Sequence, residues 1–338
     1  MHVTIKDVAQ KAGVSTATVS MVINHKSSRI SDRTKQNILK VIEELGYHPN
    51  YAARSLMTSR TKTISLVVPD VSNPFFADFA KCFESRLSQR DYSVLLCNSG
   101  NDIEREKKYL SEAIYHSTDA LVISSVNIEE LSQTSLFKQI DIPILLFDRK
   151  LHSNTVNTIF IDNFHGGYLA AKELVEHHHT NICCISGSFQ LPTVKERFLG
   201  FEQYLYECQI PFDPSNLFEG ELTIEHGYQS ALKILNSERR KNITAVFCTN
   251  DLIAAGVYKA LSERHIQIPD SFSIVGFDNI ALSSFLSPPL TTIAQPVREL
   301  GEQSADLIIE LLSGITSLKQ VCLPISIVRR ESVKFLER

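Results

Sequence analysis

The chain has 338 residues, of which 43% are hydrophobic and 21% charged, with a formal net charge of −4 at pH 7; these values are ordinary for a globular protein. No apolar stretch reaches the length of a membrane span, and the N-terminus has the pattern of a capped helix rather than a secretion leader. These features exclude a membrane protein and an exported one, so we expect a cytoplasmic protein without a membrane partner.

The distribution of charge and the number of cysteines further limit the class of protein. Residues 1–60 carry nine Lys and Arg against four acids, a balance of +5, so the remaining residues sum to −9. A basic head on an acidic body is the electrostatic footprint of a protein that binds duplex nucleic acid, and salt should weaken that binding steeply. The seven cysteines are odd in number and lack CxxC spacing, which predicts reduced thiols in the core.

Residues 3–24 predict two short helices joined by a tight turn at Gly13. Thr4 can accept hydrogen bonds from the first amides of one helix, and Ser15 can cap a second helix running from residue 16 to about 24. Glycine ends the first helix because it enters left-handed backbone without steric cost. This is helix-turn-helix spacing, although two ordinary amphipathic helices at a domain edge fit the bare pattern as well.

Two further helices follow in this head. Ser31 can cap a helix over 32–46 that ends at Gly46, with Pro49 just beyond. A segment over 50–57 begins at Asn50, a residue type that caps helices, but at eight residues it should be marginal on its own.

From residue 63 onward, apolar runs of strand length alternate with amphipathic helical windows. The expected strands lie at 63–69, 92–98, 119–124, 142–147, 158–161, 181–186, 244–248, 272–277 and 324–332. The expected helices lie at 75–90, 103–116, 129–138, 164–178, 193–208, 250–264 and 296–313. This alternation predicts an α/β protein with two doubly wound parallel sheets, each covered by helices on both faces.

Polar residues follow several of these strands, where open parallel sheets bind their ligands. They are Asn73, Asp148, Arg149, Asn250, Asp251, Asp278, Asn279 and Gln295, and Arg197 lies in the first turn of a helix. Charged hydrogen bonds in a closed cleft are worth about 1.5–3 kcal/mol each. We therefore expect a polyol site between the two halves, with strand-end caps as the alternative role; Asp251 and Asn279 fit caps better than ligands.

The chain resembles the LacI/GalR family of bacterial transcriptional regulators over its whole length. The resemblance is carried by TIKDVAQKAGVSTATVSMVIN, ELGYHPNYAARSL and the α/β body. It implies a helix-turn-helix DNA-binding domain at 1–49, a hinge helix and linker at 50–60, and an effector-binding and dimerisation domain at 61–338. The N-subdomain is then about 61–160 plus 293–321, the C-subdomain about 161–290 plus 322–338, and the chain crosses between them three times.

In such regulators the second helix lies in the major groove of operator DNA. The resemblance therefore puts base reading on Thr16, Ala17 and Met21. It implies further DNA contacts by Thr4, Ser15, Thr18, Ser20, Asn24, Tyr47, Asn50, Ala53, Arg54 and Leu56. Leu56 matches the hinge leucine that wedges into the minor groove, burial against the body being the alternative. Met21 departs from the pattern, since Arg or His is frequent there; methionine offers only apolar contact, for example to a thymine methyl.

The same resemblance implies a sugar site. Phe75 and Phe76 would sandwich the ring, with Asn73 and Gln295 around it. The other implied ligand residues are Asp148, Arg149, Arg197, Leu222, Asn250, Phe277 and Asp278. A ribose-type site commonly has an aromatic residue near Leu222, so the sugar could differ. Asp162 and Asn163 would be hinge groups.

Other chemistries are disfavoured. The histidines 177–179 are expected to form a solvated helix terminus rather than a metal site. No GxSxG, Walker or HExxH motif is present, so we expect no enzyme, cofactor or metal. We expect a homodimeric repressor, with a dimer surface around Asp78, 225–236 and 252–264, released from a palindromic operator by a pentose or hexose. The alternative is a regulator that needs a corepressor, either a purine or a phosphorylated carrier protein.

Overall fold

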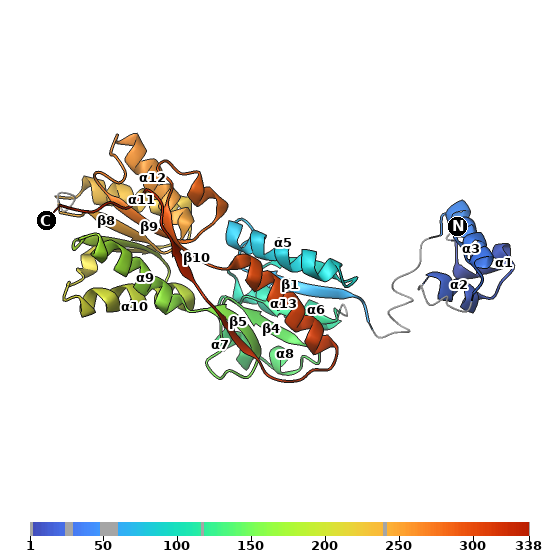
Figure 1. Ribbon diagram of the computed structural model, residues 1–338. Helices are drawn as coiled ribbons and strands as arrows, with labels where there is room; N and C mark the ends of the chain where they lie inside the picture. The colour runs from blue at the N-terminus through green and yellow to red at the C-terminus, as the bar shows by residue number, and fades with distance from the viewer. Residues whose placement is uncertain (1–2, 24–29, 48–59, 116–117, 239–241, 338) are drawn as a thin grey trace. The chain divides into compact units, whose positions relative to one another are not determined.

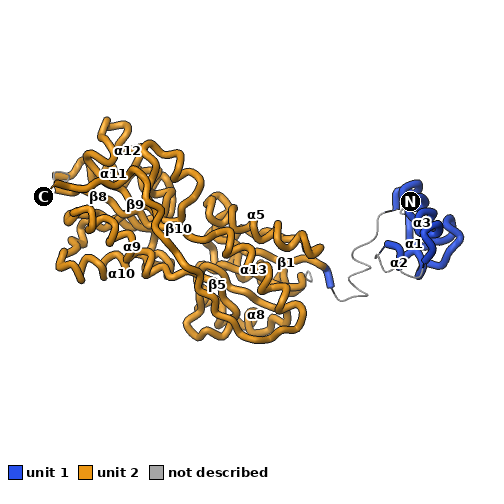
Figure 2. The backbone as a smooth tube through the Cα atoms, in the orientation of Figure 1, with its two compact units in different colours: residues 1–61 blue, residues 62–338 orange. Residues whose placement is uncertain are grey.

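The computed structural model describes residues 3–23, 30–47, 60–115, 118–238 and 242–337. The chain forms two compact units, residues 1–61 and residues 62–338 (Figure 2). Within the described ranges, no helix is long and apolar enough to cross a membrane.

The first unit contains α1 (Ile5–Ala12), α2 (Thr16–Ile23) and α3 (Asp32–Leu45). α1 ends at Gly13, whose φ of 69° is left-handed as expected. The cap of α1 differs in detail from the expectation. The Thr4 backbone carbonyl accepts the early amides, whereas the Thr4 amide and hydroxyl both donate to the Asp7 carboxylate at 2.7 Å. These two hydrogen bonds lower the pKa of Asp7.

The other two helix starts follow the sequence signals. Ser15 Oγ accepts the Thr18 amide at 3.1 Å, and Ser31 Oγ accepts the Thr34 amide at 3.3 Å. α3 ends at Gly46 in left-handed backbone. A small core unites the helices, with Val8, Ala9, Ala12, Val19, Val22, Ile38 and Val41 buried. The pair α1 and α2 with its tight turn is therefore a helix-turn-helix.

The second unit contains two six-stranded sheets with helices on both faces (Figure 1). The first sheet has the order β11-β5-β4-β3-β1-β2, with all neighbours parallel. Its strands are β1 (Thr63–Val68), β2 (Ser93–Asn98), β3 (Ala120–Ile123), β4 (Ile144–Phe147), β5 (Asn157–Ile161) and β11 (Gln320–Leu323). Its helices are α5 (Pro74–Ser88), α6 (Ile103–Tyr115), α7 (Ile128–Gln133), α8 (Ser135–Lys138) and α13 (Val297–Leu312). α5 and α13 pack together, and α6 and α7 cover the opposite face.

The second sheet has the order β12-β10-β9-β8-β6-β7, parallel except for the antiparallel pair of β12 and β10. Its strands are β6 (Ile182–Gly187), β7 (Leu217–Gly220), β8 (Ala245–Cys248), β9 (Ser273–Asp278), β10 (Thr291–Ala294) and β12 (Ser326–Val328). Its helices are α9 (Asn163–Glu176), α10 (Pro192–Glu207), α11 (Ile224–Asn236) and α12 (Asp251–Glu263), with the short η1 (Pro214–Asn216) and η3 (Ala281–Ser284). α9 and α10 lie on one face, and α11 and α12 on the other (Figure 1).

The chain passes from one sheet to the other after β5, β10 and β11. β10, which ends at Ala294, lies in the second sheet, and β11, which ends at Leu323, lies in the first.

Three expectations need correction. β2 is an edge strand with Leu95 and Leu96 exposed, so it is not covered on both faces. The expected helix over 129–138 is interrupted at Thr134, whose extended backbone ends α7 and caps α8. Cys208 and Cys322 are exposed, whereas Cys97, Cys183, Cys184 and Cys248 are core thiols.

The histidine triplet also differs from the expectation, because one of its members is buried rather than solvated. His179 is fully buried, with Nδ1 at 2.9 Å from Thr244 Oγ1 and Nε2 at 3.1 Å from the Lys334 carbonyl. Burial lowers the pKa of His179 to about 4. His177 stacks on Phe335 at 4.1 Å between ring centroids, so these histidines fasten the C-terminal segment to the end of α9.

Candidate functional site

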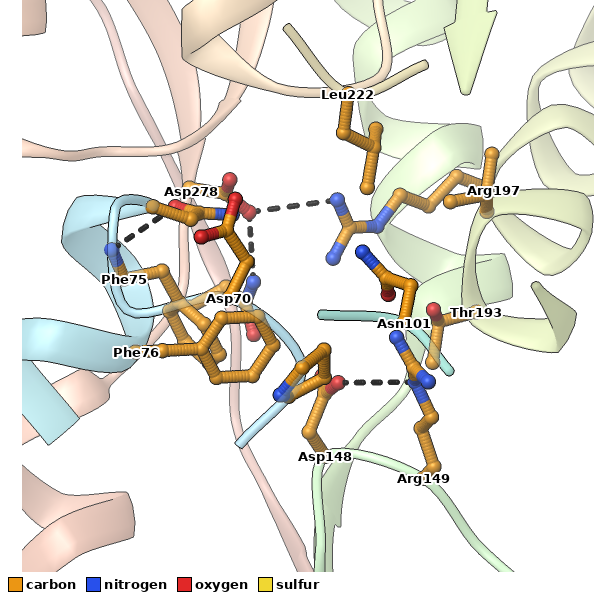
Figure 3. Close-up of a pocket in the computed structure, with 14 residues that line it drawn as sticks. Asp70, Phe75, Phe76, Asn101, Asp148, Arg149, Thr193, Arg197, Leu222 and Asp278 are labelled. Atoms are coloured by element: carbon orange, nitrogen blue, oxygen red, sulfur yellow. Dashed lines mark hydrogen bonds and ion pairs between the residues drawn. The ribbon is translucent and has the colours of Figure 1, made fainter. Parts of the chain in front are cut away.

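A cleft lies between the two sheets, at the carboxyl ends of their strands, with about 530 Å³ of space not filled by atoms (Figure 3). Its lining residues are Pro69, Asp70, Asn73, Phe75, Phe76, Asn101, Asp148, Arg149, Thr193, Val194, Arg197, Leu222, Asp278 and Gln295. The cleft therefore brings together most of the residues that sequence reasoning proposed as ligands.

The start of α5 supplies the aromatic wall. Asn73 Oδ1 accepts the Phe75 amide at 3.1 Å, and Pro74 occupies the first helical turn, so α5 has a fixed beginning. Phe75 and Phe76 meet edge to face, with 5.1 Å between ring centroids. Phe76 also contacts Phe147 of β4 at 6.2 Å. Both rings are thus held by packing before any ligand arrives.

Asp148 and Arg149 follow β4 and form a buried ion pair, with Arg149 Nε 3.6 Å from Asp148 Oδ2. Asp148 adopts left-handed backbone with φ of 65°. Arg149 Nη1 donates to the Ser125 carbonyl at 2.7 Å, but Arg149 Nε has no hydrogen-bond partner among the described residues. Burial raises the pKa of Asp148 and lowers that of Arg149, while their mutual attraction opposes both shifts.

Arg197 enters the cleft from α10, and two of its three guanidinium nitrogens donate hydrogen bonds to protein acceptors. Its Nε donates to Asn163 Oδ1 at 2.8 Å, and its Nη1 donates to the Thr249 carbonyl at 2.7 Å and to Asp278 Oδ1 at 3.3 Å. The guanidinium also lies 3.7 Å from the centroid of the Phe277 ring, within cation–π range. These hydrogen bonds and the ring contact fix the direction in which this charge faces the cleft.

The close packing of α9 on α10 places Arg197 there. A β-carbon on Gly167 would lie 1.7 Å from the Arg197 carbonyl oxygen, and one on Gly200 would lie 1.8 Å from the Phe164 carbonyl oxygen. Only glycine permits the two backbones to approach this closely. The glycines therefore set the distance between Arg197 and its partner Asn163.

Asp278, at the end of β9, is the second carboxylate of the cleft. Gln295 Nε2 donates to Asp278 Oδ1 at 2.7 Å, whereas the buried Gln295 Oε1 has no partner among the described residues. Burial raises the pKa of Asp278 to about 6, although Arg197 acts in the opposite direction. Asp278 has φ of 110°, a strained backbone for a residue with a side chain. The carboxylate and the amide together offer one charged acceptor and one unused acceptor to a ligand.

Asn250 and Phe277, two of the expected ligand residues, do not line the cleft. Asn250 Oδ1 accepts the Ile253 amide at 2.9 Å and caps α12, and its amide group donates to the Leu222 carbonyl at 3.4 Å. Phe277 is fully buried beneath Arg197. Asn250 and Phe277 therefore contact residues that line the cleft, namely Leu222 and Arg197.

The expected caps and hinge groups have structural roles. Asp251 accepts from the Thr292 hydroxyl at 2.6 Å and the Ile280 amide at 3.0 Å, and burial raises its pKa to about 8. Asn279 accepts from Arg330 at 2.6 Å. Asp162 caps α9 by accepting the His165 amide at 2.8 Å.

Sequence reasoning missed five lining residues, namely Pro69, Asp70, Asn101, Thr193 and Val194. Asp70 follows β1, so the strand-end rule that found Asp148 could have found it. Thr193 lies in the first turn of α10, four residues before Arg197, and could have been inferred from that arginine. Asn101 lies in an irregular loop with φ of 58°, for which we see no sequence signal.

The helix-turn-helix unit presents the expected DNA-facing residues on its surface. Thr4, Ser15, Thr16 and Ala17 are exposed, Thr18 and Ser20 are half-buried, and Met21 is 41% exposed. Tyr47 packs against the helical core. Asn24, Asn50, Ala53, Arg54 and Leu56 lie outside the described residues.

Two family models match the chain. Residues 4–50 match the bacterial regulatory proteins of the lacI family, and residues 61–330 match the periplasmic binding proteins and sugar binding domain of the LacI family. Together they cover the helix-turn-helix unit and the unit that contains the cleft.

Individual proteins agree with these models. The HTH-type transcriptional repressor PurR of Aliivibrio fischeri (strain MJ11) is 36% identical over 307 residues, 91% of each chain. The lac repressor dimer bound to operator and the anti-inducer ONPF superposes with a TM-score of 0.86 and 28% identity, over 99% of this chain and 100% of that one. A ribose-bound LacI family regulator from Enterococcus faecalis V583 is 34% identical, with a TM-score of 0.70 over 81% of this chain and 100% of that one. The chain belongs to the LacI family and is a DNA-binding transcriptional repressor, not an enzyme.

Proposed function

We propose that the cleft binds a pentose or hexose and that this sugar releases the repressor from its operator. One observation carries the proposal: the cleft contains a buried donor, Arg149 Nε, and a buried acceptor, Gln295 Oε1, that no described residue satisfies. A sugar hydroxyl both donates and accepts, and its CH faces suit the rings of Phe75 and Phe76. A family member that is 34% identical has been crystallised with ribose.

We assign the parts of the chain accordingly. Residues 1–49 form the DNA-binding domain and residues 61–338 the effector domain. Thr16, Ala17 and Met21 read bases in the major groove. The protein then acts in the bacterial cytoplasm, where the operator is.

A homodimer would place two such heads on a palindromic operator. The exposed apolar residues of the second unit support this state: Leu95 (49% exposed) and Leu96 (46%) on the edge strand β2, and Phe285 (82%) after η3. Exposed apolar patches and bare strand edges are typical of interfaces. The surface expected around Asp78, α11 and α12 is thereby extended by β2.

The dimer proposal can be tested by sedimentation equilibrium. Replacing Leu95 and Leu96 together by lysine should shift the protein from dimer to monomer and weaken operator binding. The matched control is Leu318→Lys, which is similarly exposed (53%) and should leave the dimer intact. A double variant that stays dimeric would remove β2 from the interface.

The mechanism follows from the construction of the cleft. Its lining comes from both sheets, so a bound sugar favours one spacing of the two subdomains. A ligand shifts an equilibrium only by its different affinities for the two states, with coupling of about 1–3 kcal/mol in such switches. Release of DNA then requires that the sugar-bound spacing hold the heads apart.

A corepressor function is the second candidate, because a relative that is 36% identical over 91% of the chain is the repressor PurR. In that case a purine would occupy the cleft and tighten the operator complex. A phosphorylated carrier protein could act in the same direction without entering the cleft.

The test is to select a palindromic operator from random duplexes and measure its affinity by fluorescence anisotropy while ribose, xylose, glucose, galactose, hypoxanthine or guanine is titrated. A sugar that weakens the complex supports our proposal. A purine that strengthens it would establish the corepressor function instead. Operator affinity that no compound changes would overturn the proposal of a sugar inducer.

A further inference from the structure

The exposed side of α2 carries no charged residue. The structure describes all eight residues of this helix, and its two buried valines face the core of the first unit. Thr16, Ala17 and Met21 are its exposed residues, and Met21 is 41% exposed. Because residues four positions apart are neighbours on a helix surface, Ala17 and Met21 lie side by side. The outward side of α2 therefore presents the alanine methyl group next to the methionine thioether.

The cations that the helices of the first unit carry lie on α1 and α3. Among the described residues, α1 contributes Lys6 and Lys11, and α3 contributes Arg33, Lys35 and Lys40. Lysine and arginine contact the phosphates of DNA, whereas the base edges in the major groove are uncharged. The unit therefore separates two kinds of surface, with cations for the DNA backbone on α1 and α3 and an uncharged surface for the bases on α2.

The exposed side of α2 also lacks the side chains that read one base through hydrogen bonds. In such readout, Arg or Lys binds guanine, Asn or Gln binds adenine, and Asp or Glu accepts from cytosine. None of these residue types occurs in α2, whose sequence is TATVSMVI. The hydroxyl of Thr18 lies 2.9 Å from that of Ser15, and a hydroxyl serves as donor or acceptor and so fits different bases. Hydrogen bonds from α2 therefore discriminate poorly among the four base pairs.

The apolar surface of α2 matches one group of the major groove. The C5-methyl group of thymine projects into that groove, where alanine and other apolar side chains read it by contact. A methionine chain is unbranched and polarizable, so it can follow the shape of a methyl group. Removing one methyl group from such a contact should cost about fourfold in affinity. An operator recognised in this way loses affinity when the thymine methyl group alone is removed.

We infer that Ala17 and Met21 select operator DNA by the C5-methyl group of thymine, so that α2 reads an A·T pair in each half-site by apolar contact. This inference rests on the proposed base reading by α2 and does not depend on the identity of the effector. Met21 is then the specificity-determining residue, because its side chain reaches further from the helix than that of Ala17. The same chemistry accepts 5-methylcytosine, whose methyl group occupies the same place in the groove.

The test begins with selection of an operator from random duplexes by the full-length protein. Each thymine of the selected half-site is then replaced by uracil, which keeps every hydrogen-bonding group and removes only the methyl group. At the thymine that faces α2, fluorescence anisotropy should show about a fourfold loss of affinity per half-site. At the same position, 5-methylcytosine opposite guanine should bind more tightly than cytosine opposite guanine.

Protein variants assign this effect to Met21. Uracil should cost Met21→Ala much less affinity than it costs the wild type, which a double-mutant cycle between the side chain and the methyl group measures. Met21→Leu keeps an apolar side chain and should keep the uracil effect. The matched control is Leu39→Ala, which truncates an exposed leucine of α3 (54%) and should leave the uracil effect at its wild-type size.

The outcomes separate methyl recognition from the base reading on which it rests. If no uracil substitution weakens binding, or if the loss is equal in the wild type and in Met21→Ala, methyl recognition is wrong. Base reading by Met21 is then retained where Met21→Ala still weakens the complex with the selected operator. If Met21→Ala neither weakens that complex nor changes the bases selected, the proposed base reading by Met21 fails as well.

Discussion

Each subdomain brings one buried Asp–Arg pair to the cleft, and the two pairs are built differently. Asp148 and Arg149 are consecutive in the chain and lie 3.6 Å apart, and Arg149 retains one unused donor. Arg197 and Asp278 come from distant elements, and Arg197 donates to three protein acceptors. In the first pair, Arg149 keeps a donor that a ligand can use. In the second pair, protein acceptors hold Arg197, so its charge faces the cleft in a fixed direction.

The largest effect should come from Arg197→Ala. It removes the hydrogen bonds to Asn163, the Thr249 carbonyl and Asp278. The side chains on this side of the cleft then lose their fixed positions, and Asp278 remains buried without its cation. We expect ligand affinity to fall about 100-fold and operator affinity to change little, measured by titration calorimetry and anisotropy. The matched control is Arg298→Ala, an exposed arginine paired with Glu302. Equal loss of operator binding would assign Arg197 to the structure of the whole unit.

Arg149→Ala should have the next largest effect. It removes the unused donor and the bond to the Ser125 carbonyl, and it leaves the Arg197 wall intact, so we expect about a tenfold loss of ligand affinity. Urea denaturation should show a smaller loss of stability than for Arg197→Ala, because fewer protein acceptors are left without donors. A loss larger than that of Arg197→Ala would reverse the proposed roles of the two pairs.

The pH dependence of stability should reveal the titration of the Asp278 carboxylate. The pKa of Asp278 is raised to about 6, above its unfolded value of about 3.9. Between these values the folded state binds more protons at Asp278 than the unfolded one does, so the contribution of Asp278 to the free energy of unfolding is greatest below about pH 4 and falls as pH rises to about 6.

Asp278→Asn isolates this contribution, because its amide oxygen can accept the same hydrogen bonds from Arg197 and Gln295. Relative to this variant, the wild type should lose on the order of 2 kcal/mol of unfolding free energy over that range, as measured by urea denaturation at a series of pH values. Parallel pH profiles for the two proteins would show that Asp278 does not titrate there.

The smallest effect should come from Glu106→Gln. Glu106 is fully buried and accepts the Val126 amide at 2.8 Å and the Ser125 hydroxyl at 2.5 Å. The loop it holds supplies the Ser125 carbonyl that binds Arg149. We expect a loss of ligand affinity of about threefold that vanishes in an Arg149→Ala background, measured as a double-mutant cycle. Additive losses would mean that Glu106 acts on the cleft by another route.

Sequence reasoning reached most of the cleft by one rule, that polar residues after parallel strands meet at one edge. It found Asp148, Arg149, Asp278 and Gln295 in this way. It could not separate Asn250 from these, because a strand-end asparagine has the same pattern whether it caps a helix or contacts a ligand. It also could not find the bare edge of β2, since Leu95 and Leu96 have the same residue type as leucines of the buried strands.

The sequence by itself determined the helix starts at Thr16 and Asp32, the glycine stops, the alternation of strands and helices, and membership of the family. The helix starts and stops depend on residues three or four positions apart, so local chemistry is sufficient for them, and the alternation and the family are patterns of residue type along the chain. Only the tertiary structure decided that Arg197 would donate to three protein acceptors and that Arg149 would keep a donor without an acceptor. The partners of Arg197 lie 34 to 81 positions away, and which strand ends meet depends on where the chain crosses between the sheets.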